Sequence, residues 1–179
     1  MPVPQLRPPA LMSRMPSSIR RDDFLIVGYG NTLRGDDGAG PRVAEAVAAL
    51  NYPGARALAC ALLTPELADP ISQARAVLFV DAAVDAPREV RLRKIEPAES
   101  AQIMSHAAGP AALLALARDV FGRAPEAWWL TIPAVKFDFG GDFSPQTQQG
   151  IARALEKIES LCRQKSAGAS PRPDQPGQH

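Results

Sequence analysis

Short apolar runs alternate along this chain with segments in which apolar residues recur every three or four positions. The run FLIVGY at 24–29 is typical of a buried strand, and Val43, Val47 and Leu50 after it share one face of a helix. The alternation continues to residue 162, which indicates a mostly parallel sheet covered by helices on both faces. The pattern predicts strands at 24–29, 56–63, 76–84, 89–95 and 128–135, and helices at 41–50, 64–73, 110–121 and 145–162.

The strands at 76–84 and 89–95 are joined by a very short link. The segment 85–88 cannot carry the chain across the sheet to a parallel position, so we expect these two strands to pair antiparallel. The predicted fold is therefore α/β: a three-layer sandwich with a mostly parallel, twisted five-stranded sheet, one strand antiparallel, flanked by helices.

The two ends of the chain lack this apolar period. Residues 1–22 and 165–179 are rich in proline and polar residues, so we expect a disordered N-terminal extension, one α/β domain at 23–164 and a disordered C-terminal tail. A chain of 179 residues that is 46% apolar can bury the core of one domain.

Charge and cysteine content exclude several partners. Lys and Arg number 20 against 19 Asp and Glu, so no overall field favours nucleic acid or an anionic membrane. No apolar run reaches the ~18 residues of a membrane-spanning helix. The two cysteines, Cys60 and Cys162, lack the CxxC spacing of a thiolate zinc site. We expect a cytoplasmic protein that binds neither nucleic acid nor a membrane.

Acidic residues and a histidine follow the predicted elements where ligands would bind. Asp36 and Asp37 come after the first strand, Asp81 closes the buried run VLFVD, and His106 precedes the helix at 110–121. In a mostly parallel sheet such positions converge at the carboxyl ends of the strands. Carboxylates and an imidazole suit a divalent first-row metal, and the lack of thiolates favours one held loosely or supplied by a partner.

Each of these residues also has a purely structural interpretation. Asp81 can cap the next turn, and His106 can be a partly buried loop residue. One of the two adjacent aspartates can be the N-cap of the following helix, which explains the other poorly. A phosphate-binding loop is excluded, because Leu33 stands where a dinucleotide fingerprint needs its third glycine and no lysine follows as in a P-loop.

One stretch carries a specific resemblance. GYGNTLRGDDGAGPRVAEAV, at 28–47, resembles the G-x-G-N-x-L-x-x-D-D/E-G-x-G signature of the hydrogenase maturation proteases. The strand ending in Asp81 is similar to that family's second motif, and SHAAGP, at 105–110, is similar to the loop that supplies its histidine. The resemblance covers about residues 23–162. Because that family trims the C-terminal extension of nickel-iron hydrogenase large subunits, it implies a metal-dependent, aspartate-type endopeptidase.

The resemblance further implies a role for each candidate residue. Asp37, Asp81 and His106 correspond to the catalytic, metal-contacting positions. The metal would be nickel, supplied by the hydrogenase large-subunit precursor, the partner protein, rather than permanently bound. Asp36 would be the helix cap beside these ligands.

The remaining candidate residues shape the binding loop. Gly28 and Gly30 let the backbone turn tightly, and Asn31 can hydrogen-bond its own backbone. The segments ALLTPELADP and IPAVKFDFGGDFSP depart from the family's pattern near the mouth of the site. The identity of the substrate therefore does not follow from the resemblance.

Three functions are open at this point. The first is an endopeptidase acting on a nickel-loaded precursor, with the metal polarising the scissile carbonyl or activating water and Asp37 or Asp81 taking a proton. The second is a non-catalytic, metal-sensing maturation chaperone or adaptor for a hydrogenase-like partner. The third is a hydrolase with its own resident metal.

Overall fold

The computed structural model describes residues 24–84, 89–99 and 109–167, and in these ranges each predicted strand and helix is present with ends shifted by a few residues. The elements, in chain order, are β1 (Phe24–Tyr29), the 3₁₀ turn η1 (Gly35–Gly38), α1 (Ala39–Leu50), β2 (Ala55–Cys60), the 3₁₀ turn η2 (Pro65–Leu67), α2 (Ala68–Gln73), β3 (Ala76–Ala83), β4 (Arg91–Ile95), α4 (Pro110–Phe121), β5 (Glu126–Pro133) and α5 (Pro145–Ala167).

The strands form one sheet in the order β2-β1-β3-β5-β4. β1 pairs in parallel with β2 and with β3, β3 pairs in parallel with β5, and β4 pairs antiparallel with β5. The predicted α/β class, with a mostly parallel five-stranded sheet and one antiparallel strand, is confirmed.

The predicted partner of the antiparallel strand is wrong. β4 does not pair with β3, because β5 lies between them. β5 is apolar on both faces and suits the interior of the sheet, whereas β4 carries exposed charged residues that suit an edge. A short link requires the chain to reverse direction, but it can still span the width of one intervening strand, roughly 10 Å from β3 to β4.

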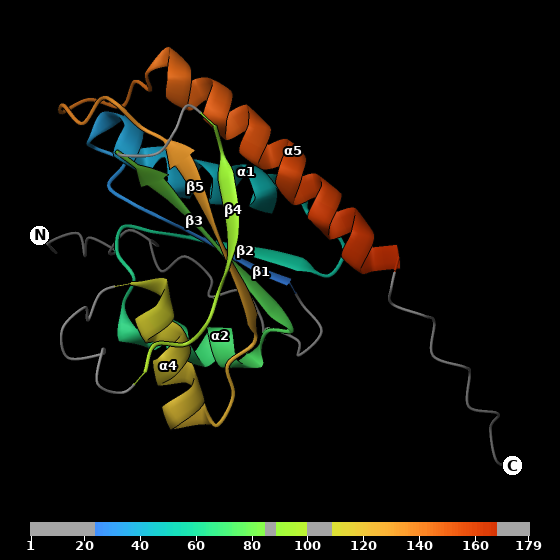
Figure 1. Cartoon of the computed structure of the whole chain (residues 1–179). Coiled ribbons are helices and arrows are strands. Elements are labelled where there is room, and N and C mark those ends of the chain that lie inside the picture. The colour runs from blue at the N-terminus through green and yellow to red at the C-terminus, as the bar shows by residue number, and fades with distance from the viewer. Residues whose placement is uncertain (1–23, 85–88, 100–108, 168–179) are drawn as a thin grey trace, which may run out of the picture.

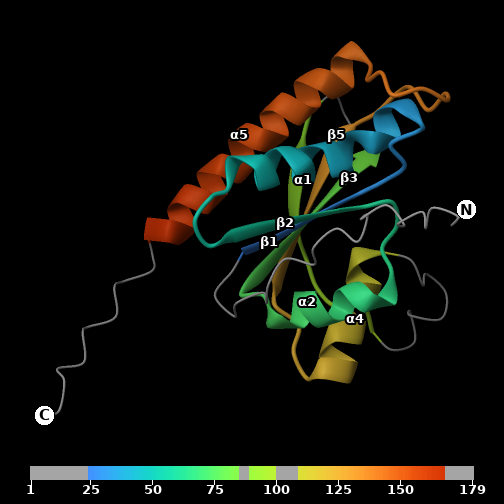
Figure 2. The same ribbon diagram turned by 180° about the vertical axis from the view of Figure 1, so that it is seen from behind.

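Helices cover the sheet on both faces. α1 and α5 lie on one face and α2 and α4 on the other, as Figures 1 and 2 show from opposite sides. Side chains alternate along each strand, so each face has its own core. Phe24 and Ile26 of β1 pack in the core under α1 and α5. Leu25 and Val27 pack in the core under α2 and α4.

Two helix ends have recognisable caps. The Ser144 hydroxyl accepts a hydrogen bond from the Thr147 amide at 3.3 Å and so caps α5, and α4 ends at Gly122 in the left-handed conformation. α5 continues to Ala167, past the boundary predicted after residue 164, while the rest of both predicted tails lies outside the described residues. In the described ranges, no helix combines the length and the apolar character needed to cross a bilayer.

Candidate active site

The connection between β1 and α1 packs tightly over the carboxyl edge of the sheet. Gly28, inside β1, lies against the first turn of α1, and a Cβ added to it would stand 2.0 Å from the Gly40 carbonyl oxygen. Gly28 has no positive φ, so it serves close packing of strand and helix rather than the tight turn predicted for it. Gly40 in turn approaches the Val80 carbonyl oxygen, which brings the start of α1 to the end of β3.

Gly30 and Asn31 shape the loop after β1. Gly30 has a φ of +139°, so the tight turn predicted here is confirmed. The Asn31 side-chain oxygen accepts a hydrogen bond from the Leu33 amide at 2.9 Å, also as predicted. The Asn31 amide donates to Asp37 Oδ2 at 3.1 Å. Within the described residues Asp37 Oδ1 has no hydrogen-bond partner, so the loop orients this half-buried carboxylate with one oxygen available to a ligand.

Asp36 points away from this loop into the protein, where it is fully buried. Its carboxylate accepts hydrogen bonds from the Val135 and Lys136 amides, both at 2.8 Å. It also accepts bonds from the Ser144 amide at 2.7 Å and the Ser144 hydroxyl at 2.8 Å. The prediction that Asp36 caps the helix is wrong, because α1 has no side-chain cap and Asp36 binds the β5–α5 connection instead.

These hydrogen bonds also decide the ionisation of Asp36. Burial alone raises the pKa of its carboxyl, but the bonds from Val135, Ser144 and Lys136 outweigh burial and leave the pKa below its ordinary value. Asp36 is therefore an ionised structural anchor. It ties the β1–α1 loop to the segment after β5. The Ala134 amide still donates to the Ala83 carbonyl of β3, and the two amides after it, those of Val135 and Lys136, donate to Asp36 instead of to the sheet.

Asp81 lies near the carboxyl end of β3, next to β1. Burial raises the pKa of its carboxyl to about 6, hydrogen bonds from the Tyr29 hydroxyl and the Ala82 amide oppose that rise, and the charge of Asp37 adds to it. Asp37 is thus close enough for the two carboxylates to repel each other, in keeping with the packing of η1 against β3. Burial and the neighbouring Asp81 raise the pKa of Tyr29, which therefore remains a hydrogen-bond donor.

A polar row crosses the sheet at this level. Asp81 is in register with Thr131 of β5, and Thr131 is in register with Arg91 of β4. On the other side, Tyr29 of β1 is in register with Cys60 of β2. The row therefore runs from Cys60 through Tyr29, Asp81 and Thr131 to Arg91 at the carboxyl ends of the parallel strands, the edge where ligands bind in such sheets.

His106 lies outside the described residues, so its predicted place beside Asp37 and Asp81 stays a prediction. In the part of the chain that the structure describes, no group of three His, Cys, Asp or Glu side chains is arranged to hold a metal ion. The structure thus brings Asp37 and Asp81 together and separates Asp36 from them.

The paired carboxylates form a site with unmet charge. Neither Asp37 nor Asp81 has a salt bridge to any described residue. A half-buried carboxyl with a raised pKa beside a second carboxylate gains most from a cation, because the ion offsets both desolvation and repulsion. The donor set, carboxylate oxygens without thiolates, fits a divalent metal ion of the first transition row.

Sequence reasoning missed two residues that support the site. Tyr29 is the last residue of β1 and lies beside Asp81. A sequence signal for it exists: a polar aromatic residue ends one apolar strand, and an aspartate follows at the end of a neighbouring one. Ser144 stands directly before Pro145, so only its role as the cap of α5 could be predicted from local sequence. Its second role, donating to Asp36, has no local sequence signal because the two residues are 108 positions apart.

Comparisons with known proteins give matches by structure but not by sequence. No protein-family model matches this chain, and no curated protein sequence matches it. Solved structures do match. The hydrogenase maturating endopeptidase HybD from E. coli has a TM-score of 0.64 at 19% identity, covering 82% of this chain and 94% of that chain.

Two further structures agree with this match. The nickel-iron hydrogenase maturation protease HycI from Thermococcus kodakarensis has a TM-score of 0.63 at 20% identity, covering 79% of this chain and 93% of that chain. The endopeptidase HycI from Escherichia coli has a TM-score of 0.60 at 22% identity, covering 78% and 90%. The fold defines an α/β sandwich with its site at the carboxyl edge of the sheet. More particularly, it is the fold of solved hydrogenase maturation endopeptidases.

Proposed function

We propose that this protein is an endopeptidase that removes the C-terminal extension of a nickel-loaded hydrogenase large-subunit precursor. The observation that carries the proposal is the pair Asp37 and Asp81, which lie close together at the carboxyl edge of the sheet without a salt bridge to any described residue. The fold supports it, because the solved structures that share the fold are described as hydrogenase maturation endopeptidases.

Nickel belongs to the substrate in this proposal. Asp37 Oδ1 and the Asp81 carboxylate supply oxygen ligands, and His106 supplies the imidazole on sequence grounds. An ion that arrives with the precursor relieves the repulsion between the two carboxylates. The protein therefore binds a loaded precursor in preference to an empty one, and cleavage follows metal insertion.

Asp81 is suited to accept a proton in the reaction. The nickel ion supplies Lewis acidity at the scissile carbonyl or at the attacking water. Burial raises the pKa of the Asp81 carboxyl to about 6, close to neutral pH, as suits a group that takes up a proton. Tyr29 holds the Asp81 carboxylate by its hydrogen bond, and Asn31 holds Asp37, so both acidic groups are oriented before the substrate arrives.

The test is cleavage of purified precursor, loaded with nickel or free of it, followed by mass spectrometry of the products. The wild-type protein should shorten only the loaded precursor. Asp37→Asn and Asp81→Asn should each slow cleavage by at least about 100-fold, as loss of a metal-contacting or proton-transferring group does. Asp119→Asn is the control, since Asp119 is exposed on α4, outside the loops that carry the site, and this variant should cleave at the wild-type rate.

The other outcomes identify the rival functions. Binding of the loaded precursor without any cleavage would replace the endopeptidase with a metal-sensing adaptor. Stoichiometric metal in the isolated protein, together with cleavage of both precursor forms, would replace it with a hydrolase that has its own metal.

A further inference from the structure

β4 forms one edge of the sheet, nearest the viewer in Figure 1. It pairs with β5 on one side only, and no described strand pairs with its other side. The backbone groups along that outer side can therefore accept an added strand, which is a common way for proteins to bind an extended peptide.

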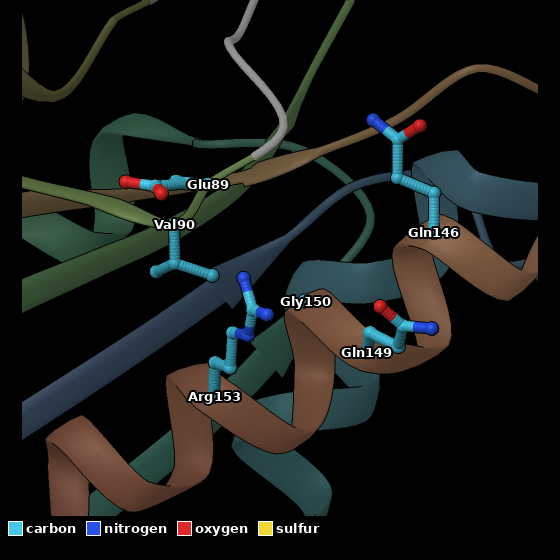
Figure 3. Close-up of a pocket in the computed structure, with 6 residues that line it drawn as sticks. All are labelled: Glu89, Val90, Gln146, Gln149, Gly150 and Arg153. Atoms are coloured by element: carbon cyan, nitrogen blue, oxygen red, sulfur yellow. The ribbon is translucent and has the colours of Figure 1, made fainter.

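A first pocket, of about 410 Å³, opens between the start of β4 and the flank of α5 (Figure 3). Figure 3 shows Val90 and the Arg153 guanidinium facing each other across it, with Gln146 and Gln149 projecting from α5. Glu89 and Gly150 complete its lining. Amide and charged groups line this pocket, so it suits a polar side chain.

A second pocket, of about 390 Å³, lies toward the other end of β4 and is lined in part by the first turn of α4. Its main feature is Arg93, whose guanidinium carbon lies 4.3 Å from the centre of the Trp129 ring. Stacking on an aromatic ring holds the guanidinium in place while its edge can still bind a carboxylate. The positive end of the α4 dipole adds to the attraction for an anion.

The charges around β4 differ between its two faces. Lys94 forms salt bridges with Glu126 at 3.3 Å and with Glu96 at 3.9 Å, so its charge is already balanced. Arg91 and Arg93 lie on the other face of β4 and form no salt bridge with any described residue. This face of β4 therefore presents two unbalanced positive charges.

We propose that β4 is the docking edge for an extended, acidic segment of the protein partner, which adds as a sixth strand and places a carboxylate on Arg93. Alternate side chains of an added strand point to opposite faces. One set would reach the Arg93 pocket, and the other would reach the pocket beside α5. Exposed charges also protect edge strands from aggregation, but that role alone requires neither a stacked arginine nor two flanking pockets.

The docking edge leads directly to the candidate active site. Arg91 is in register with Thr131, and Thr131 with Asp81, so two strand spacings, roughly 10 Å, separate β4 from Asp81. A peptide segment that passes Arg91, the end of β4 at the carboxyl edge of the sheet, needs about four extended residues to reach Asp81. The positive charge of Arg93 is also near enough to Tyr29 to oppose the rise in the pKa of that hydroxyl.

This inference deepens the proposed function, because it assigns the surface that holds the protein substrate, and its test measures binding apart from cleavage. Two short peptides serve as probes: one of alternating valine and glutamate, and one with lysine in place of glutamate. Amide NMR shifts of Arg91–Ile95 should move with the acidic peptide and not with the basic one. Arg93→Gln should weaken this binding by at least about ten-fold.

Arg42→Gln is the control, since it removes a positive charge from an exposed salt bridge on α1, outside β4 and both pockets, and its affinity should stay within about two-fold of wild type. The nickel-loaded precursor should show the same order of affinities. Absence of shifts in β4 with the acidic peptide, or equal losses in the Arg93 and Arg42 variants, would overturn the docking edge. Cleavage of the precursor by the wild-type protein decides the proposed function independently.

Discussion

The hydroxyl of Ser144 donates a hydrogen bond of 2.8 Å to the buried carboxylate of Asp36 across 108 positions of the sequence. The same hydroxyl accepts the Thr147 amide at the start of α5. One buried pair therefore joins the loop that carries Asp37 to α5, the helix that lies beside α1 on one face of the sheet. The site loop is held in place from within the core.

Asp36→Asn should lower the free energy of unfolding by about 3 kcal/mol. Asparagine keeps one acceptor oxygen but turns an NH₂ group toward donors that the carboxylate now accepts. Urea unfolding followed by circular dichroism measures the loss. Asp142→Asn makes the same chemical change at an exposed position of the following segment and should leave the midpoint unchanged.

The same carboxylate gives the protein an acid-dependent stability. The folded-state pKa of Asp36 is below its ordinary value of 3.8, so its contribution is fully present above that value and is lost as the pH falls through the lower, folded-state pKa. The wild-type protein should therefore be more stable than Asp36→Asn at pH 6, and the gap should narrow toward pH ~2. A gap that stays constant over this range would show that Asp36 contributes through shape and not through charge.

Gly28→Ala should destabilise the protein by several kcal/mol, and roughly 3 kcal/mol is a reasonable scale for overpacking. The new methyl group would stand 2.0 Å from a backbone oxygen of α1, which cannot move without shifting the helix and the loop beside it. Gly141→Ala is the control, because a methyl group there meets nothing within 4 Å and the residue has no positive φ. Comparable melting temperatures for the two variants would contradict the close packing of β1 on α1.

Features of this fold set by local sequence could be predicted, and features set by packing between distant segments could not. Strands and helices follow from local apolar periods, and the convergence of Asp37 and Asp81 follows from the rule that parallel strands share a carboxyl edge. The separate roles of Asp36 and Asp37 do not follow, because successive side chains of a 3₁₀ turn point about 120° apart and only the packed structure shows which one faces inward. The pairing partner of β4 was also predicted wrongly. A short link fixes that β4 runs antiparallel to β3, but it does not fix which strand lies next to β4.

His106→Ala tests the predicted site residue that lies outside the described residues. If His106 contacts the nickel ion of the precursor, the variant should lose cleavage of the loaded precursor by at least about 100-fold while its melting temperature stays near that of the wild type. Thermal unfolding, precursor pull-down and cleavage are measured on one preparation. A variant that binds but does not cut points to a proton-transfer role, and one that cuts at the wild-type rate removes His106 from the site.

Asp81→Asn should stabilise the free protein while abolishing cleavage, a combination that a purely structural aspartate would not show. Burial raises the folded-state pKa of Asp81 from 3.8 to about 6, so between these values the folded state holds a proton that the unfolded state has released. Stability from this group therefore falls as the pH rises through that window, and above it the cost is complete, at most about 3 kcal/mol. Asparagine cannot ionise, so the variant should match the wild type near pH 4 and exceed its unfolding midpoint at pH 7. Urea midpoints measured across this range, with Asp142→Asn as the control, decide the matter: a variant less stable than the wild type at pH 7 would mean that Asp81 is a structural cap.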